Sequence, residues 1–226
     1  MRRAAGGALR RLAGAARRRV SPRHPHWGNL RRRDPFCAHW GYTRGTPVDR
    51  VYIESFLELH RSDIRGDVAE MMSGDYSRRF GAPDVRVHVV DVDPRNAAAT
   101  VRADLCARDA LPPGSFDAWV LTQTLQFVPD PEAALANVRR SLRPGGVALI
   151  TVPCASPLAA TGAPSGDLWR LTPAGLGALC RRAMPGARVD VRGWGTLTAM
   201  TAFLLGLAAE DLRPGDLGPS DPRYPL

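Results

Sequence analysis

The chain has 226 residues, of which 44% are hydrophobic, and this length suits one sizeable α/β domain with a tail. The formal net charge of +9 at first suggests a nucleic-acid-binding protein. However, residues 1–33 hold eleven arginines and no acidic residue, which leaves twenty arginines against 22 acidic residues in the remainder. The remainder therefore has a net charge of −2, which argues against a basic globular domain.

Residues 1–33 are predicted to be a disordered basic tail, and residues 34–226 the folded domain. The tail could bind an anionic polymer or a membrane surface, but "MRRAAGGALRRLAGAARRR" has no aromatic residue for base stacking. We therefore expect no specific nucleic-acid partner. An arginine-rich start also resembles a mitochondrial transit peptide. No secretory signal is evident. We predict a cytoplasmic protein. The longest apolar run, Thr196 to Ala209, is too short to span a bilayer of about 30 Å.

The cysteines are widely scattered and predict neither a disulfide framework nor a zinc site. They are Cys37, Cys106, Cys154 and Cys180. A group of His24, His26, Cys37 and His39 could coordinate a metal in principle, but its spacing matches no known ligand pattern. The prediction is therefore no metal.

The first strong element is a helix that opens in "GTPVDRVYIESFLELH", residues 45–60. Thr46 can cap this helix, and Pro47 suits its first position. Apolar residues recur at helical spacing and predict one buried face. They are Val48, Val51, Tyr52, Phe56 and Leu59.

Short apolar strands then alternate with helical segments. The predicted strands are "DVAEMM" (67–72), "VRVHVVDVDP" (85–94), "ATVRADL" (99–105), "FDAWVLTQTL" (116–125) and "VALITVP" (147–153). The helix "DPEAALANVRRSL" has Asp130 as its predicted cap and Pro131 at its first position. This alternation predicts an α/β fold with a doubly wound, mostly parallel sheet, in which ligands bind at the carboxyl ends of the strands.

Four segments, in this order and spacing, resemble class I S-adenosylmethionine-dependent methyltransferases, and more closely the type 11 branch often found among sugar-modifying enzymes. The segments are "VVDVDP", "ADLCARDALPPGSFDAWVLTQTLQFVPDP", "LRPGGVALITVP" and "DLWRLTP". The resemblance covers roughly Trp40 to the C-terminus. It implies a Rossmann-like fold, S-adenosylmethionine as cofactor, and methyl transfer to a small-molecule or sugar-containing acceptor.

The resemblance also assigns cofactor contacts. Asp91, followed by Val92, matches the acid that accepts hydrogen bonds from the ribose hydroxyls, with Asp93 as the fallback. Asp104 and Leu105 match the pair that contacts adenine, although Asp104 could instead only cap a turn. The end of the fourth strand has a further pair, Thr122 and Gln123. These two either flank the methionine part and the acceptor or are satisfied polar residues at a strand end.

The loop after the first strand departs from the family pattern. Glu70 occupies the expected acidic position, but Met72 and Ser73 stand where glycines are usual, and Gly74 is the single glycine before Gly81. The resemblance implies that Glu70, Met72, Ser73 and Gly74 belong to the cofactor-binding residues. Side chains at these positions would occupy room that the methionine part needs, unless the loop follows another path. Asp75 can cap a short helix that follows, whose Tyr76 and Phe80 can pack against the sheet.

The N-terminal segment of this fold commonly covers the cofactor cleft, so Tyr42, Arg44 and Asp49 are candidate substrate-side residues. Trp169, in "DLWRLTP", belongs either to the cleft or to the core. No general base is identifiable. The chain ends where related sequences enter a last strand, so that strand is predicted to be missing or formed differently, and residues 196–209 could be a helix.

Two functions from different classes remain open. The first is a methyltransferase, which the retained Asp91 and Asp104 favour and which is the preferred prediction. The second is a catalytically inactive methyltransferase-like scaffold, which the glycine-poor loop and the absent last strand favour. A nicotinamide-dependent dehydrogenase is a distant third, because the glycine fingerprint that seats a pyrophosphate is absent. The sequence does not predict the oligomeric state.

Overall fold

A computed structural model of the chain describes residues 28–159 and 166–226. Residues 36–226 form one compact unit. In the unit of residues 1–35, the described part is Gly28–Pro35, which contains the 3-10 turn η1 (Gly28–Arg31). The predicted disordered tail, with His24 and His26, lies mostly outside the described residues and stays a prediction.

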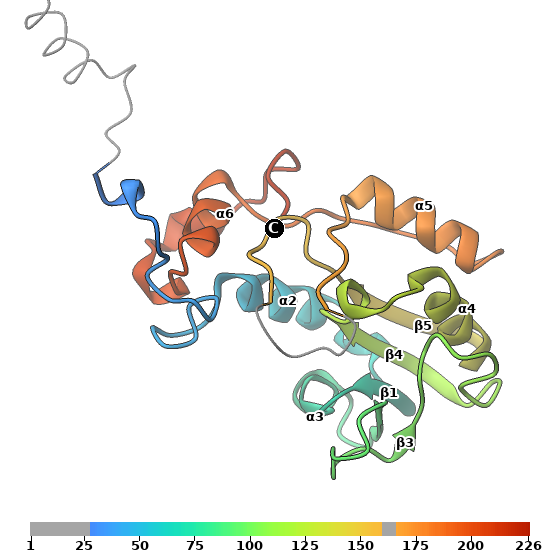
Figure 1. Cartoon of the computed structure of the whole chain (residues 1–226). Helices are drawn as coiled ribbons and strands as arrows, with labels where there is room; N and C mark the ends of the chain where they lie inside the picture. The colour runs from blue at the N-terminus through green and yellow to red at the C-terminus, as the bar shows by residue number, and fades with distance from the viewer. Residues whose placement is uncertain (1–27, 160–165) are drawn as a thin grey trace, which may run out of the picture. The chain divides into compact units, whose positions relative to one another are not determined.

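Five strands form one fully parallel sheet in the order β3-β2-β1-β4-β5 (Figure 1). The strands are β1 (Asp67–Met71), β2 (Arg86–Asp91), β3 (Val101–Arg102), β4 (Phe116–Thr122) and β5 (Leu142–Thr151). This order confirms the predicted doubly wound α/β fold. The predicted strand over 99–105 shortens to Val101–Arg102, because the Ala107 amide bonds the carbonyl of Asp104 and turns the chain away from the sheet.

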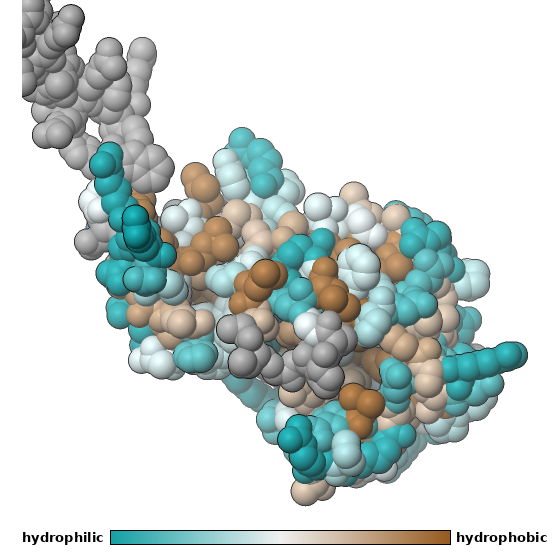
Figure 2. All heavy atoms as spheres, viewed as in Figure 1, coloured by the Kyte–Doolittle hydropathy of each residue, from teal (hydrophilic) through white to brown (hydrophobic). Residues whose placement is uncertain are grey.

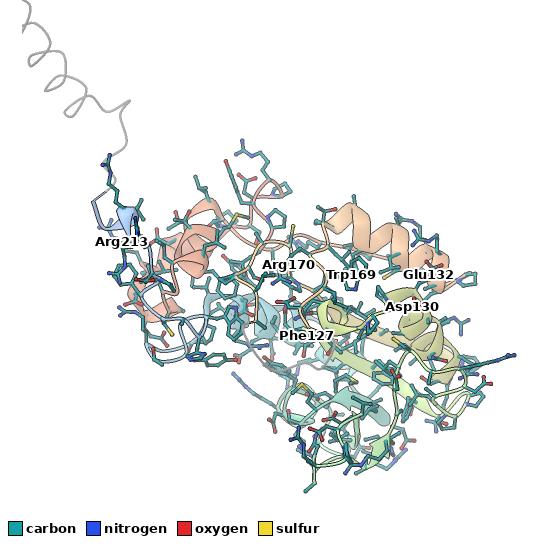
Figure 3. All side chains as sticks on the ribbon, in the orientation of Figure 1. Phe127, Asp130, Glu132, Trp169, Arg170 and Arg213 are labelled. Atoms are coloured by element: carbon teal, nitrogen blue, oxygen red, sulfur yellow. The ribbon has the colours of Figure 1, made fainter. Side chains whose placement is uncertain are left out.

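Helices cover both faces of the sheet (Figure 1). The larger core cluster joins the sheet to α4 (Pro131–Ser141) and α5 (Pro173–Ala183), and a second cluster joins it to α2 (Val48–Leu59) and α3 (Asp75–Phe80). Asp130 caps α4 as predicted, since its carboxylate accepts the Ala133 amide at 2.9 Å (Figure 3). Two further 3-10 turns are η2 (Arg61–Asp63), which follows α2, and η3 (Leu125–Phe127), which follows β4.

Trp119 of β4 belongs to the larger core cluster and is fully buried. Its indole N–H donates to the Ser141 hydroxyl at 2.9 Å, so the one polar atom of the ring is satisfied. Leu135 and Val138 of α4 are also fully buried in this cluster. Each fully buried aliphatic side chain stabilises the fold by about 1.5–3 kcal/mol, and this packing fixes β4 under α4.

The start of α2 differs from the prediction. Thr46 does not cap the helix, because its amide and its hydroxyl both donate to the carboxylate of Glu210 at 2.8 Å. Pro47 is the N-cap residue rather than the first helical residue. Leu59 is 65% exposed, so it does not belong to the buried face. The buried residues of α2 are Val48, Tyr52, Ile53 and Leu57.

The chain after α5 packs on α2 instead of extending the sheet. Helix α6 (Leu197–Leu204), in the segment for which a helix was considered, places Ala202 and Phe203 against Val48 and Tyr52. The turns η4 (Ala209–Asp211) and η5 (Pro214–Leu217) follow. Over the described residues after β5, no further strand joins the sheet.

Exposed apolar side chains occur at the carboxyl edge of the sheet. Met72, after β1, is 66% exposed, and Val92, after β2, is 60% exposed. On the face drawn in Figure 2, hydrophobic residues lie in small groups between hydrophilic ones. Within the described ranges, no helix has the length and apolar character to cross a membrane.

Candidate functional site

The strand order reverses beside β1, which pairs with β2 on one side and with β4 on the other. In open α/β sheets, ligands bind at such a reversal, outside the carboxyl ends of the strands. The loops that follow β1, β2, β3 and β4 all leave this same edge. Residues 72–74, 92–96, 103–106 and 123–124 are therefore brought together, as the sequence predicts.

Glu70 is 2% exposed and holds the start of α3. Its two carboxylate oxygens accept the backbone amides of Tyr76 at 3.1 Å and Ser77 at 2.6 Å. Burial raises the pKa of Glu70, and the hydrogen bonds from Ser77 and Tyr76 oppose that rise. The prediction that Asp75 caps this helix is wrong: Gly74 is the N-cap residue, no side chain caps α3 there, and Glu70 takes its amides.

The loop after β1 makes its turn with one glycine. Met72 has a φ of 72° and Gly74 a φ of 74°, both in the left-handed region that favours glycine. A Cβ atom at Gly74 would lie 2.7 Å from a methyl group of Val87, so a side chain is excluded there. Met72 adopts the left-handed conformation without being glycine and directs its exposed side chain away from the core. Ser73 accepts the Asp75 amide on its hydroxyl at 3.4 Å.

Asp91 ends β2 and is 9% exposed. One carboxylate oxygen accepts the Asp93 amide at 2.9 Å, and the other accepts the Asn96 side-chain amide at 2.6 Å. Asn96 also donates to the Met72 carbonyl at 2.7 Å, which ties the loop after β1 to the end of β2. The fallback residue Asp93 is engaged by Arg95, whose hydrogen bond lowers the pKa of Asp93 to about 2.

Asp104 and Leu105 follow β3. Asp104 is exposed, and one of its oxygens accepts the Cys106 amide at 2.8 Å, which is the turn-capping role considered from the sequence. Leu105 is buried, and its carbonyl accepts the Asn137 side-chain amide at 2.8 Å. Within the described part of the chain, the second oxygen of Asp104 and the amide of Leu105 have no hydrogen-bond partner. A free acceptor and a free donor therefore stand side by side.

Gln123 and Thr122 form the end of β4. Gln123 has a φ of 47°, and its amide donates to the Thr151 carbonyl of β5 at 2.9 Å. Its carbonyl accepts the Gln126 side-chain amide at 3.0 Å. The Thr122 carbonyl accepts the Thr124 hydroxyl at 3.0 Å. The backbone here is held in a fixed turn, and Gln123 lines a hollow.

The hollow has a volume of about 1180 Å³ and extends from this edge along the outer side of β5. Its lining at the carboxyl edge includes Met72, Gln123 and Gln126 from the sheet side. Asp167 and Arg170, after β5, also line it and form a two-point ion pair with distances of 2.5 and 2.7 Å. This volume is large enough for a drug-sized ligand.

Tyr42 and the start of α2 close the hollow on another side. Tyr42, Asp49 and Arg50 line it, and Arg50 donates to the hydroxyl of Tyr42 at 3.1 Å and to that of Tyr76 at 3.3 Å. Burial raises the pKa of Asp49, and the charge of Arg50 opposes that rise. The Asp49 Oδ1 atom is buried without a hydrogen-bond partner in the described structure. The site thus contains two adjacent opposite charges.

Two of the predicted substrate-side residues lie elsewhere. Arg44 forms a two-point ion pair with Asp211, at 2.6 and 2.8 Å, and does not line the hollow. Trp169 is 40% exposed and donates its indole N–H to the Val128 carbonyl at 2.8 Å, again outside the lining (Figure 3). Arg170, its neighbour in the chain, faces the hollow instead. Of the residues predicted on the substrate side, Tyr42 and Asp49 line the hollow.

Three residues of the site were not predicted from the sequence: Arg50, Asn96 and Arg170. Arg50 was adjacent to a candidate, Asp49, but its partners Tyr42 and Tyr76 come from separate segments. Asn96 lies five residues after Asp91, a spacing at which a side chain in a turn can reach back. No group of three or more His, Cys, Asp or Glu side chains in the described ranges is arranged to hold a metal.

Residues 67–150 match the protein family described as a methyltransferase domain. Among solved structures, a chain from the complex of the Haloferax volcanii Trm112 methyltransferase activator with a methyltransferase has a TM-score of 0.49 at 17% identity, covering 69% of this chain and 85% of that one. An S-adenosylmethionine-dependent methyltransferase from Aquifex aeolicus has a TM-score of 0.46 at 15% identity, covering 67% and 84%. The Haemonchus contortus phosphoethanolamine N-methyltransferase 2 has a TM-score of 0.43 at 17% identity, covering 59% and 36%.

No curated protein matches the sequence. The matched segment begins at β1, ends in β5, and includes the predicted cofactor residues from Glu70 to Gln123. The part of the chain that builds the sheet and the candidate site therefore matches a methyltransferase domain.

Proposed function

We propose that the protein is an S-adenosylmethionine-dependent methyltransferase that acts on a small-molecule or sugar-containing acceptor. The observation that supports this most is the position of Asp91, a buried acid at the end of β2 beside the point where the strand order reverses. The family match over residues 67–150 also supports it. The sugar-containing class of acceptor rests on the sequence resemblance alone.

The groups at the carboxyl edge suit the cofactor. Each carboxylate oxygen can accept two hydrogen bonds, so Asp91 can still accept from ribose hydroxyls while it accepts from Asp93 and Asn96. The free oxygen of Asp104 can accept from the exocyclic amine of adenine, and the free amide of Leu105 can donate to a ring nitrogen. Val92, directly after Asp91, is exposed and offers an apolar contact.

The cofactor would supply a methyl group on a positively charged sulfur, which makes the carbon open to direct displacement by the acceptor. The chain's own contribution is then positioning and exclusion of water. Gln123, with its backbone fixed in a turn, and the Asp167–Arg170 pair line the space that the acceptor would occupy. No general base is assigned.

A catalytically inactive binding or scaffold domain is the alternative. It is favoured by the single glycine in the loop after β1 and by the Met72 side chain that lines the hollow. A scaffold that has lost the cofactor site would keep the fold without binding S-adenosylmethionine. Cofactor binding therefore separates the two functions.

The test is calorimetric titration of S-adenosylmethionine and S-adenosylhomocysteine into the purified protein. We expect micromolar binding, which Asp91→Ala weakens by about 1.5 kcal/mol or more, since that is the worth of a hydrogen bond to a charged group. Absence of binding at millimolar ligand, in protein shown to be folded by circular dichroism, would leave only the scaffold function.

A further inference from the structure

We infer that Asp49 and Arg50, at the start of α2, bind the amino-acid end of the cofactor and thereby replace contacts that a glycine-rich loop after β1 would make. Arg50 would donate to the α-carboxylate and Asp49 would accept from the α-ammonium group. This inference rests on the proposed function. Neither residue belongs to the segment that matches the methyltransferase family, which begins at residue 67.

Arg50 is a cation that forms no ion pair, although the charge of the adjacent Asp49 acts on it. All 22 acidic residues of the chain lie within the described ranges, and none of them forms an ion pair with Arg50. Its guanidinium is held instead by two neutral hydroxyl groups, those of Tyr42 and Tyr76. A guanidinium has five N–H donors in a planar fork, and these bonds leave donors free to bind a carboxylate at two points.

Asp49 is the complementary anion. It lines the same hollow, forms no ion pair with Arg50, and has one buried oxygen without a partner. A buried acceptor left unsatisfied is unfavourable, so a ligand that donates to this oxygen gains binding free energy from it. An ammonium group, with several N–H donors and a positive charge, suits such an oxygen.

The position of Arg50 connects the pair to the loop after β1. Tyr76, one of its two partners, is the second residue of α3, and α3 starts directly after Gly74. Met72 and Gln123, which leave β1 and β4 at the reversal of strand order, line the same hollow as Asp49 and Arg50. The pair therefore lines the same hollow as Met72, whose carbonyl Asn96 links to Asp91, although Asp91 itself does not line the hollow.

The presence of both a negative and a positive side chain, Asp49 and Arg50, indicates a zwitterionic ligand rather than a simple anion. An acceptor with only a phosphate or carboxylate group would satisfy Arg50 but would be repelled by the adjacent Asp49. An α-amino acid group carries its ammonium and its carboxylate on one carbon and satisfies both. S-adenosylmethionine and S-adenosylhomocysteine each end in such a group, and 5′-methylthioadenosine lacks it.

This difference defines the experiment. The affinities of S-adenosylhomocysteine and of 5′-methylthioadenosine are measured by calorimetry for the full-length protein and for Arg50→Met, Arg50→Lys and Asp49→Asn. The matched control is Arg79→Met, because Arg79 also links α3 to α2, through Glu54 at 2.7 and 2.8 Å, but lies outside the hollow. Thermal melting confirms that each variant is folded.

We expect the wild-type protein to bind S-adenosylhomocysteine more tightly than 5′-methylthioadenosine. Arg50→Met should weaken S-adenosylhomocysteine binding about 10- to 100-fold, as expected for loss of charged hydrogen bonds, and Asp49→Asn about 10-fold. Neither variant should change the affinity for 5′-methylthioadenosine more than about threefold. Arg50→Lys should recover part of the loss, and Arg79→Met should change neither ligand.

Three results would overturn the inference. Equal weakening of both ligands in Arg50→Met would indicate a structural effect of α2. Unchanged binding of both ligands in Arg50→Met would show that Arg50 does not bind the cofactor and is available to an acceptor anion. Equal affinity of the wild-type protein for the two ligands would show that the amino-acid end is not bound. If the wild-type protein binds neither ligand, the proposed function fails as well, which distinguishes that outcome from the other three.

Discussion

The side chain of Asn96 donates a hydrogen bond of 2.6 Å to the carboxylate of Asp91. The same amide nitrogen donates to the Met72 carbonyl at 2.7 Å, so one residue orients the predicted ribose acceptor and anchors the loop after β1. Glycine-poor as it is, this loop is therefore held in place by a side chain. Asn96 is a positioning residue for the candidate cofactor site.

Replacing Asn96 tests this positioning role. Asn96→Ala removes both hydrogen bonds, and we expect it to weaken S-adenosylhomocysteine binding about fivefold, or about 1 kcal/mol, because Asp91 and the loop are no longer held in position. Asn96→Asp should weaken it further, because it places a second carboxylate beside Asp91. Calorimetry measures both. Equal affinity for the wild-type protein and Asn96→Asp would contradict the role.

Glu70 is predicted to be a determinant of stability rather than a direct ligand of the cofactor. In Glu70→Gln, one of the two oxygens that accept the Tyr76 and Ser77 amides becomes an NH₂ group, which cannot accept. The free energy of unfolding should fall by about 1–3 kcal/mol, the cost of a buried unsatisfied donor. Urea denaturation measures this change. An unchanged midpoint would show that the two amides do not depend on the carboxylate.

Because of the backbone conformation of Met72, we expect two substitutions to change the free energy of unfolding in opposite directions. Met72→Gly should be tolerated or slightly stabilising, because glycine adopts the φ of 72° without steric cost. Met72→Val should lower the free energy of unfolding by about 1–3 kcal/mol, because a β-branched residue is strained in this region. Urea denaturation of the two variants, side by side, gives the comparison. A more stable valine variant would contradict the conformation described for this loop.

The opposite end of the sheet provides a pH-dependent prediction. Asp67 accepts hydrogen bonds from Arg86 at 2.8 and 2.9 Å, from His88 at 3.0 Å and from Arg143 at 3.0 Å. The hydrogen bonds from Arg86 lower the pKa of Asp67 well below its ordinary value of 3.8, followed by those from His88 and Arg143. The folded state therefore binds fewer protons at this group than the unfolded state, and the stabilisation is present above pH 3.8 and lost as the pH falls below it.

Asp67→Asn should therefore reduce the free energy of unfolding at pH 7 by about 2 kcal/mol. The difference between the variant and the wild-type protein should shrink as the pH falls below 3.8. Because Asp67 begins β1, at the end of the strand away from the candidate site, the affinity for S-adenosylhomocysteine at pH 7 should not change. Denaturation at several pH values tests this, and a difference that widens in acid would refute the assignment.

The sheet was predictable because its strands carry their signals locally. Residues 85–94 and 116–125 are apolar, β-branched and bounded by turn residues, and β2 and β4 lie within them. The cap of α4 was predictable for the same reason, since Asp130 followed by proline is a local signal. The length of β3 was overestimated because the residues that follow it in the chain leave the sheet in a turn. Hydrogen bonds such as that from the Ala107 amide to the Asp104 carbonyl hold this turn.

The site was only partly predictable because several of its contacts join distant segments. Thr46 has a side chain that can cap a helix, but its amide and hydroxyl donate to Glu210, which lies near the other end of the chain. Asp75 stands at the right position to cap α3, yet the buried Glu70 takes the amides. Arg50 donates to the hydroxyl groups of Tyr42 and Tyr76, which belong to separate segments of the chain. No periodicity in the sequence predicts that these side chains lie together.

A crystal structure of the protein with S-adenosylhomocysteine is the most direct test of the central claim, that this edge of the sheet binds the cofactor. We expect the ribose hydroxyls within hydrogen-bond distance of Asp91, the adenine beside Asp104 and Leu105, and the amino-acid end at Asp49 and Arg50. A complex in which the ligand lies elsewhere, or a crystal at saturating ligand that shows none bound at this edge, would contradict it.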